Sequence, residues 1–226
     1  MPTTIAFDVY GTLIDTQGIV VELTQRIGSK APEFSRLWRD KQLEYAFRRG
    51  LMRRYENFSV CTADALDYTN LAFGSPLTQE DREELMAAYA VLPAFADVGA
   101  GLESSRSAGH RLFAFSNGRA DAVAQLLSHA RIIDYFEDIV SVDEIGSYKP
   151  DPGVYHHFLR RSGAEAADAW LISSNPFDVT GAISAGLRAA WIRRSPDALF
   201  DPWRIEPTLI ASDLIGLAQS IDAHRA

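Results

Sequence analysis

Cysteine is nearly absent from this 226-residue sequence, in which Cys61 is the only one. A single thiol cannot close a disulfide within the chain, so the sequence favours a reducing compartment, and we expect the cytoplasm. No apolar run approaches the roughly 20 residues needed to span a bilayer, and the N-terminus has no basic segment of the signal-peptide type. We therefore expect no membrane association.

Positively charged residues are also few, which bears on a second class of protein, those that bind nucleic acid. The 22 Lys and Arg residues are outnumbered by 30 Asp and Glu residues, which gives a net charge of −8 and argues against nucleic acid as a partner. The five histidines are dispersed, and the adjacent His156 and His157 project to different sides of a predicted helix. No predicted strand precedes the glycines at 99 and 101, so they do not form a dinucleotide loop. The sequence therefore predicts no metal site and no cofactor.

Short runs of apolar and β-branched residues recur along most of the chain. The first covers residues 3–7 and stops at Asp8, and later runs cover 111–115, 139–142, 169–172, 189–192 and 208–211. Patterns typical of helices separate them, at 120–130, 153–162, 179–185 and 213–221. Strands that alternate with helices of this length indicate βαβ units. The sequence therefore predicts an α/β fold with a parallel sheet covered on both faces.

The stretch between Asp15 and about Pro93 has a different pattern. Apolar residues recur there at helical spacing, and Thr78 is a candidate cap for a helix that continues through Glu80. A helical insert directly after the first strand would lie over the carboxyl ends of the sheet, where open α/β sheets bind ligands. We therefore predict a core domain of residues 1–14 and 95–226 and a helical domain of residues 15–94.

Four polar segments follow the predicted strands in order. They are Asp8-Val9-Tyr10-Gly11-Thr12, Ser116-Asn117-Gly118, Lys149-Pro150 and Ser173-Ser174-Asn175-Pro176-Phe177-Asp178. Each segment alone could be an ordinary turn. Together they resemble the motifs of the haloacid dehalogenase superfamily, and the resemblance covers essentially the whole chain. It implies a three-layer, Rossmann-like core, a helical cap formed by the insert, and Asp8 as the nucleophile.

Tyr10 separates two activities within this resemblance. Most of the superfamily transfers phosphoryl groups and carries a second aspartate two residues after the nucleophile, where it protonates the leaving group. Tyr10 stands there instead, and an unperturbed pKa of about 10 makes tyrosine a poor general acid near neutral pH. A halide leaves as a stable anion and needs no such acid. The sequence is thus most similar to the L-2-haloacid dehalogenase branch.

This branch implies that short (S)-2-haloalkanoic acids are hydrolysed to (R)-2-hydroxyalkanoic acids through an aspartyl ester on Asp8. A small 2-haloacid and a halide ion would then be the partners. The resemblance implies that Lys149 keeps Asp8 ionised and that Thr12 holds Asp8 by a hydrogen bond. It also implies that Asp178 orients the attacking water. Ser173 and Asn175 would position Asp178 and Lys149.

The resemblance further implies a set of substrate-binding residues. Ser116 and the backbone N–H groups of Asn117 and Gly118 would hold the substrate carboxylate, and Arg39 with the Asn117 side chain would bind the halide. Tyr10, Tyr155 and Phe177 complete the predicted set, although Tyr155 fits a core position equally well. Phe177 departs from the tryptophan often found there, which leaves the halide preference open.

Two other interpretations stay open at this point. One is a magnesium-dependent small-molecule phosphatase, against which Tyr10 argues. The other is a non-catalytic binding protein with the same fold, against which the joint presence of Asp8, Lys149 and Asp178 argues. Because the family commonly forms dimers, a homodimer is the expected assembly.

Overall fold

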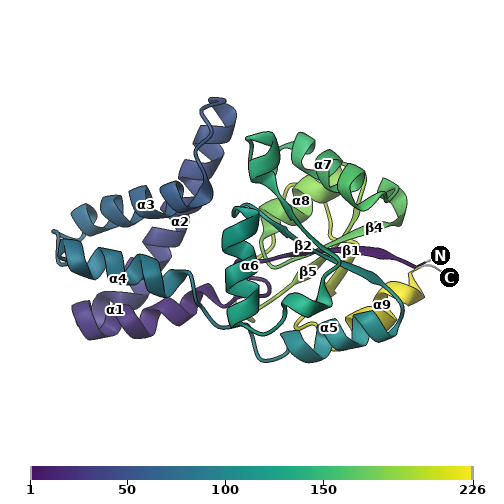
Figure 1. The fold of residues 1–226 in the computed structure, drawn as a ribbon, viewed down its shortest axis with the longest axis horizontal. Helices are drawn as coiled ribbons and strands as arrows, with labels where there is room; N and C mark the ends of the chain where they lie inside the picture. The colour runs from purple at the N-terminus through teal and green to yellow at the C-terminus, as the bar shows by residue number, and fades with distance from the viewer. Residues whose placement is uncertain (1, 225–226) are drawn as a thin grey trace.

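The computed structural model describes residues 2–224 and is built on a six-stranded sheet (Figure 1). The strands are all parallel and follow the order β3-β2-β1-β4-β5-β6. Their bounds are β1 Thr4–Asp8, β2 Arg111–Ser116, β3 Asp138–Ser141, β4 Ala169–Ser173, β5 Arg188–Ile192 and β6 Leu209–Ala211. The predicted parallel α/β sheet is confirmed, with strand ends that differ from the prediction by about a residue.

Helices cover both faces of the sheet (Figure 1). One face packs against α5 (Val98–Ser107), α6 (Ala120–His129) and α9 (Leu217–Ala223), and the other against α7 (Pro152–Ser162) and α8 (Pro176–Ser184). Successive residues of β1 enter opposite layers: Ile5 and Phe7 join one core cluster, and Ala6 joins the other. A strand buried on both faces needs apolar residues throughout, which explains the continuous apolar runs in the sequence.

The register of the strands brings the motif residues to one edge of the sheet. Asp8 pairs with Phe115 of β2, one residue before Ser116, and Phe7 pairs with Ile172 of β4, one residue before Ser173. Because all strands run in the same direction, the segments that follow their carboxyl ends meet at this edge.

Four helices form the segment between β1 and α5, and they stand apart from the sheet in Figure 1. They are α1 (Ile19–Ile27), α2 (Ala31–Leu51), α3 (Phe58–Ala72) and α4 (Gln79–Tyr89), with two 3₁₀ turns, η1 (Thr16–Gly18) and η2 (Gly28–Lys30). The buried residues of α2 recur every three or four positions, as expected for a helix with one packed face. The predicted cap at Thr78 is confirmed, since Thr78 and Asp81 form a capping box.

The chain crosses between the core and these helices twice, and the two crossings are paired. Ile14 and Ala94 form an antiparallel bridge. On either side of it, the Asp15 N–H donates to the Pro93 carbonyl at 2.9 Å and the Phe95 N–H donates to the Leu13 carbonyl at 3.0 Å. These hydrogen bonds join the outgoing and returning segments at the carboxyl edge of the sheet.

A second set of contacts joins the helical segment to the core near Lys149. Tyr55 donates to the Asp143 carboxylate at 2.8 Å, and Tyr148 donates to the Glu56 carbonyl. The Cys61 Sγ atom of α3 is fully buried and lies 3.3 Å from the Tyr148 hydroxyl. The helical segment therefore touches the core on two sides, at the crossings and at Tyr148.

Two predicted boundaries are wrong for local reasons. The helix predicted over 213–221 starts only at Leu217, because Gly216 has a φ of +77°, which a right-handed helix cannot include. The helix predicted from 179 starts earlier, at Pro176, a residue favoured in the first helical turn. The remaining 3₁₀ helices are η3 (Ile133–Tyr135), η4 (Val142–Ile145) and η5 (Ala166–Asp168). Along the described chain, no helix is long and apolar enough to cross a membrane.

Candidate active site

The carboxylate of Asp8, at the end of β1, is the centre of the site and is largely buried. Its Oδ2 atom accepts hydrogen bonds from Thr12 Oγ1 at 2.7 Å and Asn175 Nδ2 at 2.7 Å. Ser173 Oγ adds a third hydrogen bond at 3.3 Å. Its Oδ1 atom instead faces the Lys149 ammonium at 3.1 Å. The two oxygens therefore have different surroundings: Oδ2 is held by three donors and Oδ1 lies beside a cation.

Lys149 enters the site from the loop after η4 and is buried to 1% exposure. Its Nζ atom donates to Asp8 Oδ1, to Asp178 Oδ2 at 2.8 Å and to the Phe115 carbonyl at 2.8 Å. An ammonium has three N–H donors, so these three acceptors use all of them. Lys149 thus has a fixed position between two carboxylates.

Asp178 lies in the first turn of α8 and is fully buried. Its Oδ2 faces Lys149, and its Oδ1 accepts a hydrogen bond from the Tyr155 hydroxyl at 2.9 Å. Burial raises the pKa of Asp178 to about 6; the nearby Asp8 adds to this shift and Lys149 opposes it. The carboxyl can therefore take up a proton near neutral pH.

Burial also acts on Lys149, but with a different net result. Burial disfavours the ammonium, yet the carboxylates of Asp178 and Asp8 together outweigh this effect and raise the pKa of Lys149. The cation therefore persists in the buried site. Tyr155, which could have been only a core aromatic, is both buried and hydrogen-bonded to Asp178.

One predicted set of contacts is correct only in part. Ser173 and Asn175 were expected to position Asp178 and Lys149, but both side chains donate to Asp8, and only the Asn175 carbonyl contacts Asp178, by accepting its backbone N–H at 3.0 Å. The reason is the β1–β4 pairing, which places the end of β4 directly beside Asp8. Lys149 and Tyr155 hold the carboxylate of Asp178.

The Ser116-Asn117-Gly118 turn joins β2 to α6 at the same edge. The Gly118 N–H donates to Ser116 Oγ at 3.0 Å, so this donor is used within the turn. Asn117 Oδ1 accepts a hydrogen bond from the Lys149 backbone N–H at 3.0 Å, which leaves its Nδ2 as the donor end. The Gly118 N–H therefore drops out of the predicted site for the substrate carboxylate. The Ser116 hydroxyl and the Asn117 N–H remain in that prediction.

Arg39 is the contribution of α2 to the site. Its Nη2 atom donates to the Tyr10 carbonyl at 3.3 Å, and its Nη1 atom donates to Gln42 Oε1 at 2.6 Å. Gln42 is buried and in turn donates to the Thr62 hydroxyl of α3. The structure thus brings Arg39 from the helical segment to the loop that follows Asp8.

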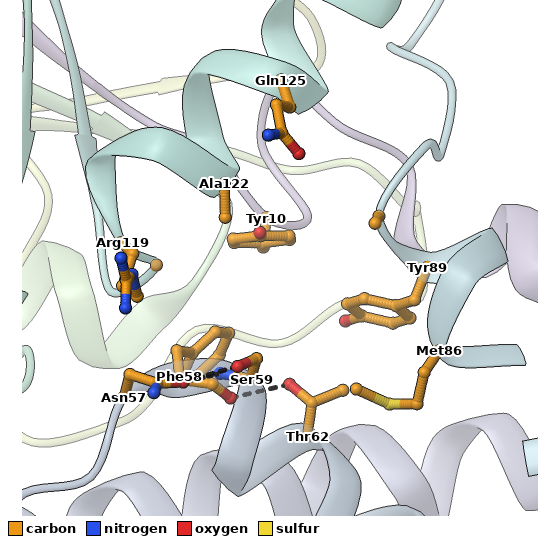
Figure 2. Close-up of a pocket in the computed structure, with 12 residues that line it drawn as sticks. Tyr10, Asn57, Phe58, Ser59, Thr62, Met86, Tyr89, Arg119, Ala122 and Gln125 are labelled. Carbon is orange, nitrogen blue, oxygen red and sulfur yellow. Dashed lines mark hydrogen bonds between the residues drawn. The ribbon is translucent and has the colours of Figure 1, made fainter. Parts of the chain in front are cut away.

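The Tyr10 side chain faces a small pocket between the helical segment and α6 (Figure 2). The Tyr10 and Tyr89 rings are stacked with centroids 6.1 Å apart, and Phe58 lies 5.6 Å from Tyr10. The pocket has a volume of about 100 Å³, and Met86 and Gly118 are also among its lining residues. Burial raises the pKa of Tyr10, with Tyr89 adding to the shift, so the phenol is neutral and a weak acid.

Phe177 and Arg39 line different pockets. The Phe177 ring packs edge to face on Phe47 of α2, with centroids 5.0 Å apart. Together with Lys149 and Trp203 it lines a separate pocket of about 490 Å³, whereas Arg39 lines a small cavity beside Trp38. The expectation that Phe177 helps to bind the halide with Arg39 therefore stays a prediction.

Two residues that shape the site, Ser174 and Gln42, were not predicted as site residues. Ser174 donates through its backbone to Thr12 Oγ1 at 2.8 Å and through its hydroxyl to the Gly11 carbonyl at 2.6 Å. Gln42 orients Arg39, and its signal in the sequence was a polar residue one turn after Trp38 on the packed face of α2. Among residues 2–224, no group of three or more His, Cys, Asp or Glu side chains is placed to hold a metal ion.

Comparison with known proteins identifies the family of this chain. The family model of haloacid dehalogenase-like hydrolases matches residues 2–186, and the chain belongs to this family of hydrolases. Within the family its place is the L-2-haloacid dehalogenase branch. The (S)-2-haloacid dehalogenase of Pseudomonas sp. (strain YL) is 38% identical over 191 residues, 84% of this chain and 82% of the relative. The Pseudomonas putida (S)-2-haloacid dehalogenase is 34% identical over 210 residues, 93% of this chain and 92% of the relative.

A solved structure of the same branch has the same fold. It is L-2-haloacid dehalogenase from Xanthobacter autotrophicus with chloropropionic acid covalently bound. It superposes with a TM-score of 0.91 at 27% identity and covers 98% of this chain and 99% of its own.

Proposed function

We propose that the protein hydrolyses short (S)-2-haloalkanoic acids to (R)-2-hydroxyalkanoic acids, with Asp8 as the nucleophile. The unequal setting of the two Asp8 oxygens carries this proposal. Oδ2 is held by three donors, so Oδ1 is the atom that attacks carbon 2 from the side opposite the halogen. The carbon–halogen bond breaks, the halide leaves with the bonding electrons, and the configuration inverts. Lys149 offsets the repulsion between the Asp8 and substrate carboxylates.

The second half of the reaction returns Asp8 to its original state. In the ester, Oδ2 is the carbonyl oxygen, and its three donors are already aimed at the negative charge that forms when water attacks. Asp178 takes one proton of that water and returns it to Oδ1 as the bond between Asp8 Cγ and Oδ1 breaks, so that Oδ1 leaves as the hydroxyl of the product. The proton that remains on the new Asp8 carboxyl group is released to solvent. The released hydroxy acid carries an oxygen that came from Asp8. The chloropropionic acid covalently bound to the Xanthobacter enzyme supports such an intermediate.

The substrate has three groups to place. We assign its carboxylate to the Ser116 hydroxyl and the Asn117 N–H, and its halogen to Arg39 and Asn117 Nδ2. The substituent on carbon 2 fits the pocket beside Tyr10. At about 100 Å³ this pocket is well below the roughly 300 Å³ of sites for drug-sized ligands, which favours short chains.

We also propose that residues 15–94 act as a cap and that the chain forms a homodimer. Exposed apolar side chains gather at the end of α2 and on α3, among them Leu51, Met52 directly after α2, and Leu71. Basic Arg48 and acidic Asp67 line the same surface. Both are paired within the chain, Arg48 with Glu44 and Asp67 with Arg82, so the exposed apolar side chains are what a two-fold partner would cover. Sedimentation of the wild type and of Leu71→Glu tests this arrangement, with dissociation of the variant expected.

A single-turnover experiment in ¹⁸O-water tests the function. With enzyme in excess over (S)-2-chloropropionate, the first product should be unlabelled and the peptide that contains Asp8 should gain ¹⁸O. Label in the product at once, with Asp8 unlabelled, would mean direct attack by water. Asp8→Asn should release no halide. A rate lost on chelation with EDTA and restored by magnesium would instead support the phosphatase interpretation.

A further inference from the structure

Arg194 lies two residues after the end of β5, outside the four motifs, and its side chain is 14% exposed. Its Nη1 atom donates to both carboxylate oxygens of Asp97, at 2.7 and 2.8 Å. Its Nη2 atom donates to the Thr12 carbonyl at 2.6 Å. The guanidinium also lies 4.2 Å from the centre of the Phe95 ring. One planar group therefore holds an acidic side chain and a backbone carbonyl together.

The carbonyl that Arg194 holds belongs to a residue in contact with the nucleophile. The Thr12 hydroxyl donates to Asp8 Oδ2 at 2.7 Å and accepts a hydrogen bond from the Ser174 N–H. Thr12 is therefore fixed on its side-chain end by the site and on its backbone end by Arg194. A shift of this carbonyl would move the hydroxyl that orients Asp8.

Asp97, the other partner of Arg194, lies in the segment that returns from the helices to the core. Asp97 is the residue before α5, and its Oδ2 also accepts the Leu214 N–H at 2.7 Å, which ties it to the core. Phe95, beneath the guanidinium, donates to the Leu13 carbonyl of the outgoing crossing. Arg194 thus joins both crossings to the sheet at the point where the helical segment attaches.

We propose that Arg194 is a positioning residue for the reaction: by holding the Thr12 carbonyl and Asp97, it fixes the Asp8 loop against both crossings. The proposal rests on the function proposed above, because it assigns the attack to Asp8. Arginine is suited to this task since its fork donates in two directions at once, whereas lysine is a compact charge that serves one partner.

The test compares three variants with the wild type on (S)-2-chloropropionate. Arg194→Lys keeps a charge for Asp97 but loses the donor to Thr12, so the protein should stay folded while kcat falls about tenfold. Arg194→Ala loses both contacts, and kcat should fall about 100-fold, the loss that a misplacement of about 1 Å can cause. KM should stay within about twofold in both, because Arg194 does not touch substrate. Asp97→Asn should resemble Arg194→Lys, since it weakens the anchor of the guanidinium.

Arg111 supplies the matched control. It also pairs with a carboxylate, Glu137, and donates to a backbone carbonyl, that of Ser162 at 2.9 Å, but it lies at the opposite end of the strands from Asp8. Arg111→Lys and Arg111→Ala should leave kcat at the wild-type value, even where they lower the melting temperature.

Hydrogen exchange gives a readout that does not depend on turnover. The N–H groups of Gly11, Leu13 and Ile14 are hydrogen-bonded within the loop after Asp8. Arg194→Lys should speed exchange in the peptide that covers residues 9–15, and Arg111→Lys should not. Wild-type kcat or unchanged exchange in Arg194→Lys would overturn the proposal. A wild type that released no halide would overturn the dehalogenase function instead, while the exchange measurement would still decide whether Arg194 holds the loop.

Discussion

Asp8, Lys149 and Asp178 form a buried ionic triplet in which one ammonium lies between two carboxylates. The triplet has one positive and two negative charges, so the loss of Lys149 would leave two carboxylates buried without a counter-charge, which is strongly unfavourable. Asp178 is fully buried, and its raised pKa shows that its surroundings disfavour the ionised carboxylate.

The raised pKa of Asp178 predicts an acid limit for the second half-reaction. In the proposed mechanism Asp178 is the base, and it can act only when it is deprotonated; its pKa is about 6 while Asp8 carries its negative charge. The ester removes that charge, so hydrolysis of the ester should fall as the pH is lowered, with a midpoint below 6. Rapid-quench measurement of the hydrolysis of the Asp8 ester between pH 4.5 and 8.5 checks this dependence. A rate that is flat across this range would remove Asp178 as the base.

Arg39 should matter most when the leaving group is poor. Arg39→Lys replaces a planar fork by a single mobile charge, so we expect a lower rate for every haloacid and a larger loss for chloride than for bromide. Arg36 on the same helix is exposed and is the control for a charge-preserving change. Equal rates for Arg36→Lys, Arg39→Lys and the wild type would show that Arg39 does not contact the halide.

The three ionic residues of the site could be predicted from sequence, but not all of their partners. Asp8, Lys149 and Asp178 follow strands in contiguous motifs, so their shared location follows from a parallel sheet. Ser173 and Asn175 have donors that could reach either carboxylate, and only the register between β1 and β4 decides for Asp8. Arg194 and Asp97 lie 97 residues apart, and no local pattern links them.

At the scale of elements, α8 has to approach its neighbours very closely to deliver Asp178. Gly181 lies one turn after Asp178, and a Cβ atom there would come within 2.4 Å of the Tyr155 hydroxyl and 2.7 Å of Pro150. Glycine at this position therefore lets α8 pack against α7 and the lysine loop. The close packing also keeps Tyr155 within hydrogen-bonding distance of Asp178.

Gly181→Ala should for this reason be harmful despite the better helix propensity of alanine. We expect a loss of about 1–3 kcal/mol in the free energy of unfolding from overpacking, together with slower ester hydrolysis as Tyr155 is displaced. Gly99→Ala in α5 is the control, because nothing lies within 4 Å of a Cβ atom there, and it should gain up to about 1 kcal/mol. Urea unfolding of both variants measures the difference, and equal stabilities would contradict the packing argument.

The type of each element could be predicted where the chain shows clear periodicity. The boundary of an element could not be predicted where the conformation of a single residue sets it. The apolar runs gave all six strands, and Thr78 gave the start of α4. Gly216 was hidden within an apolar pattern, and only its positive φ delays the start of α9 to Leu217. Helix starts of this kind depend on backbone conformation, which hydrophobic spacing does not report.

At the scale of the whole molecule, the site is formed by residues of both the α/β core and the helical segment. The sheet supplies Asp8, Lys149 and Asp178, and α2 supplies Arg39. Residues on both sides line the pocket beside Tyr10 (Figure 2). We expect the helical segment to separate from the core when substrate enters and product leaves, since closure of such a segment is a common way to exclude water during a reaction.

The position of Cys61 makes this separation measurable without introducing a cysteine. The chain's one thiol is fully buried against Tyr148, and burial raises its pKa, so it should react with a thiol reagent only while the interface is open. The rate at which Cys61 is modified then measures how often the interface opens. Tyr148→Phe should speed it, and a saturating 2-hydroxy acid should slow it. A rate unaffected by either would show that Cys61 becomes exposed by a different motion.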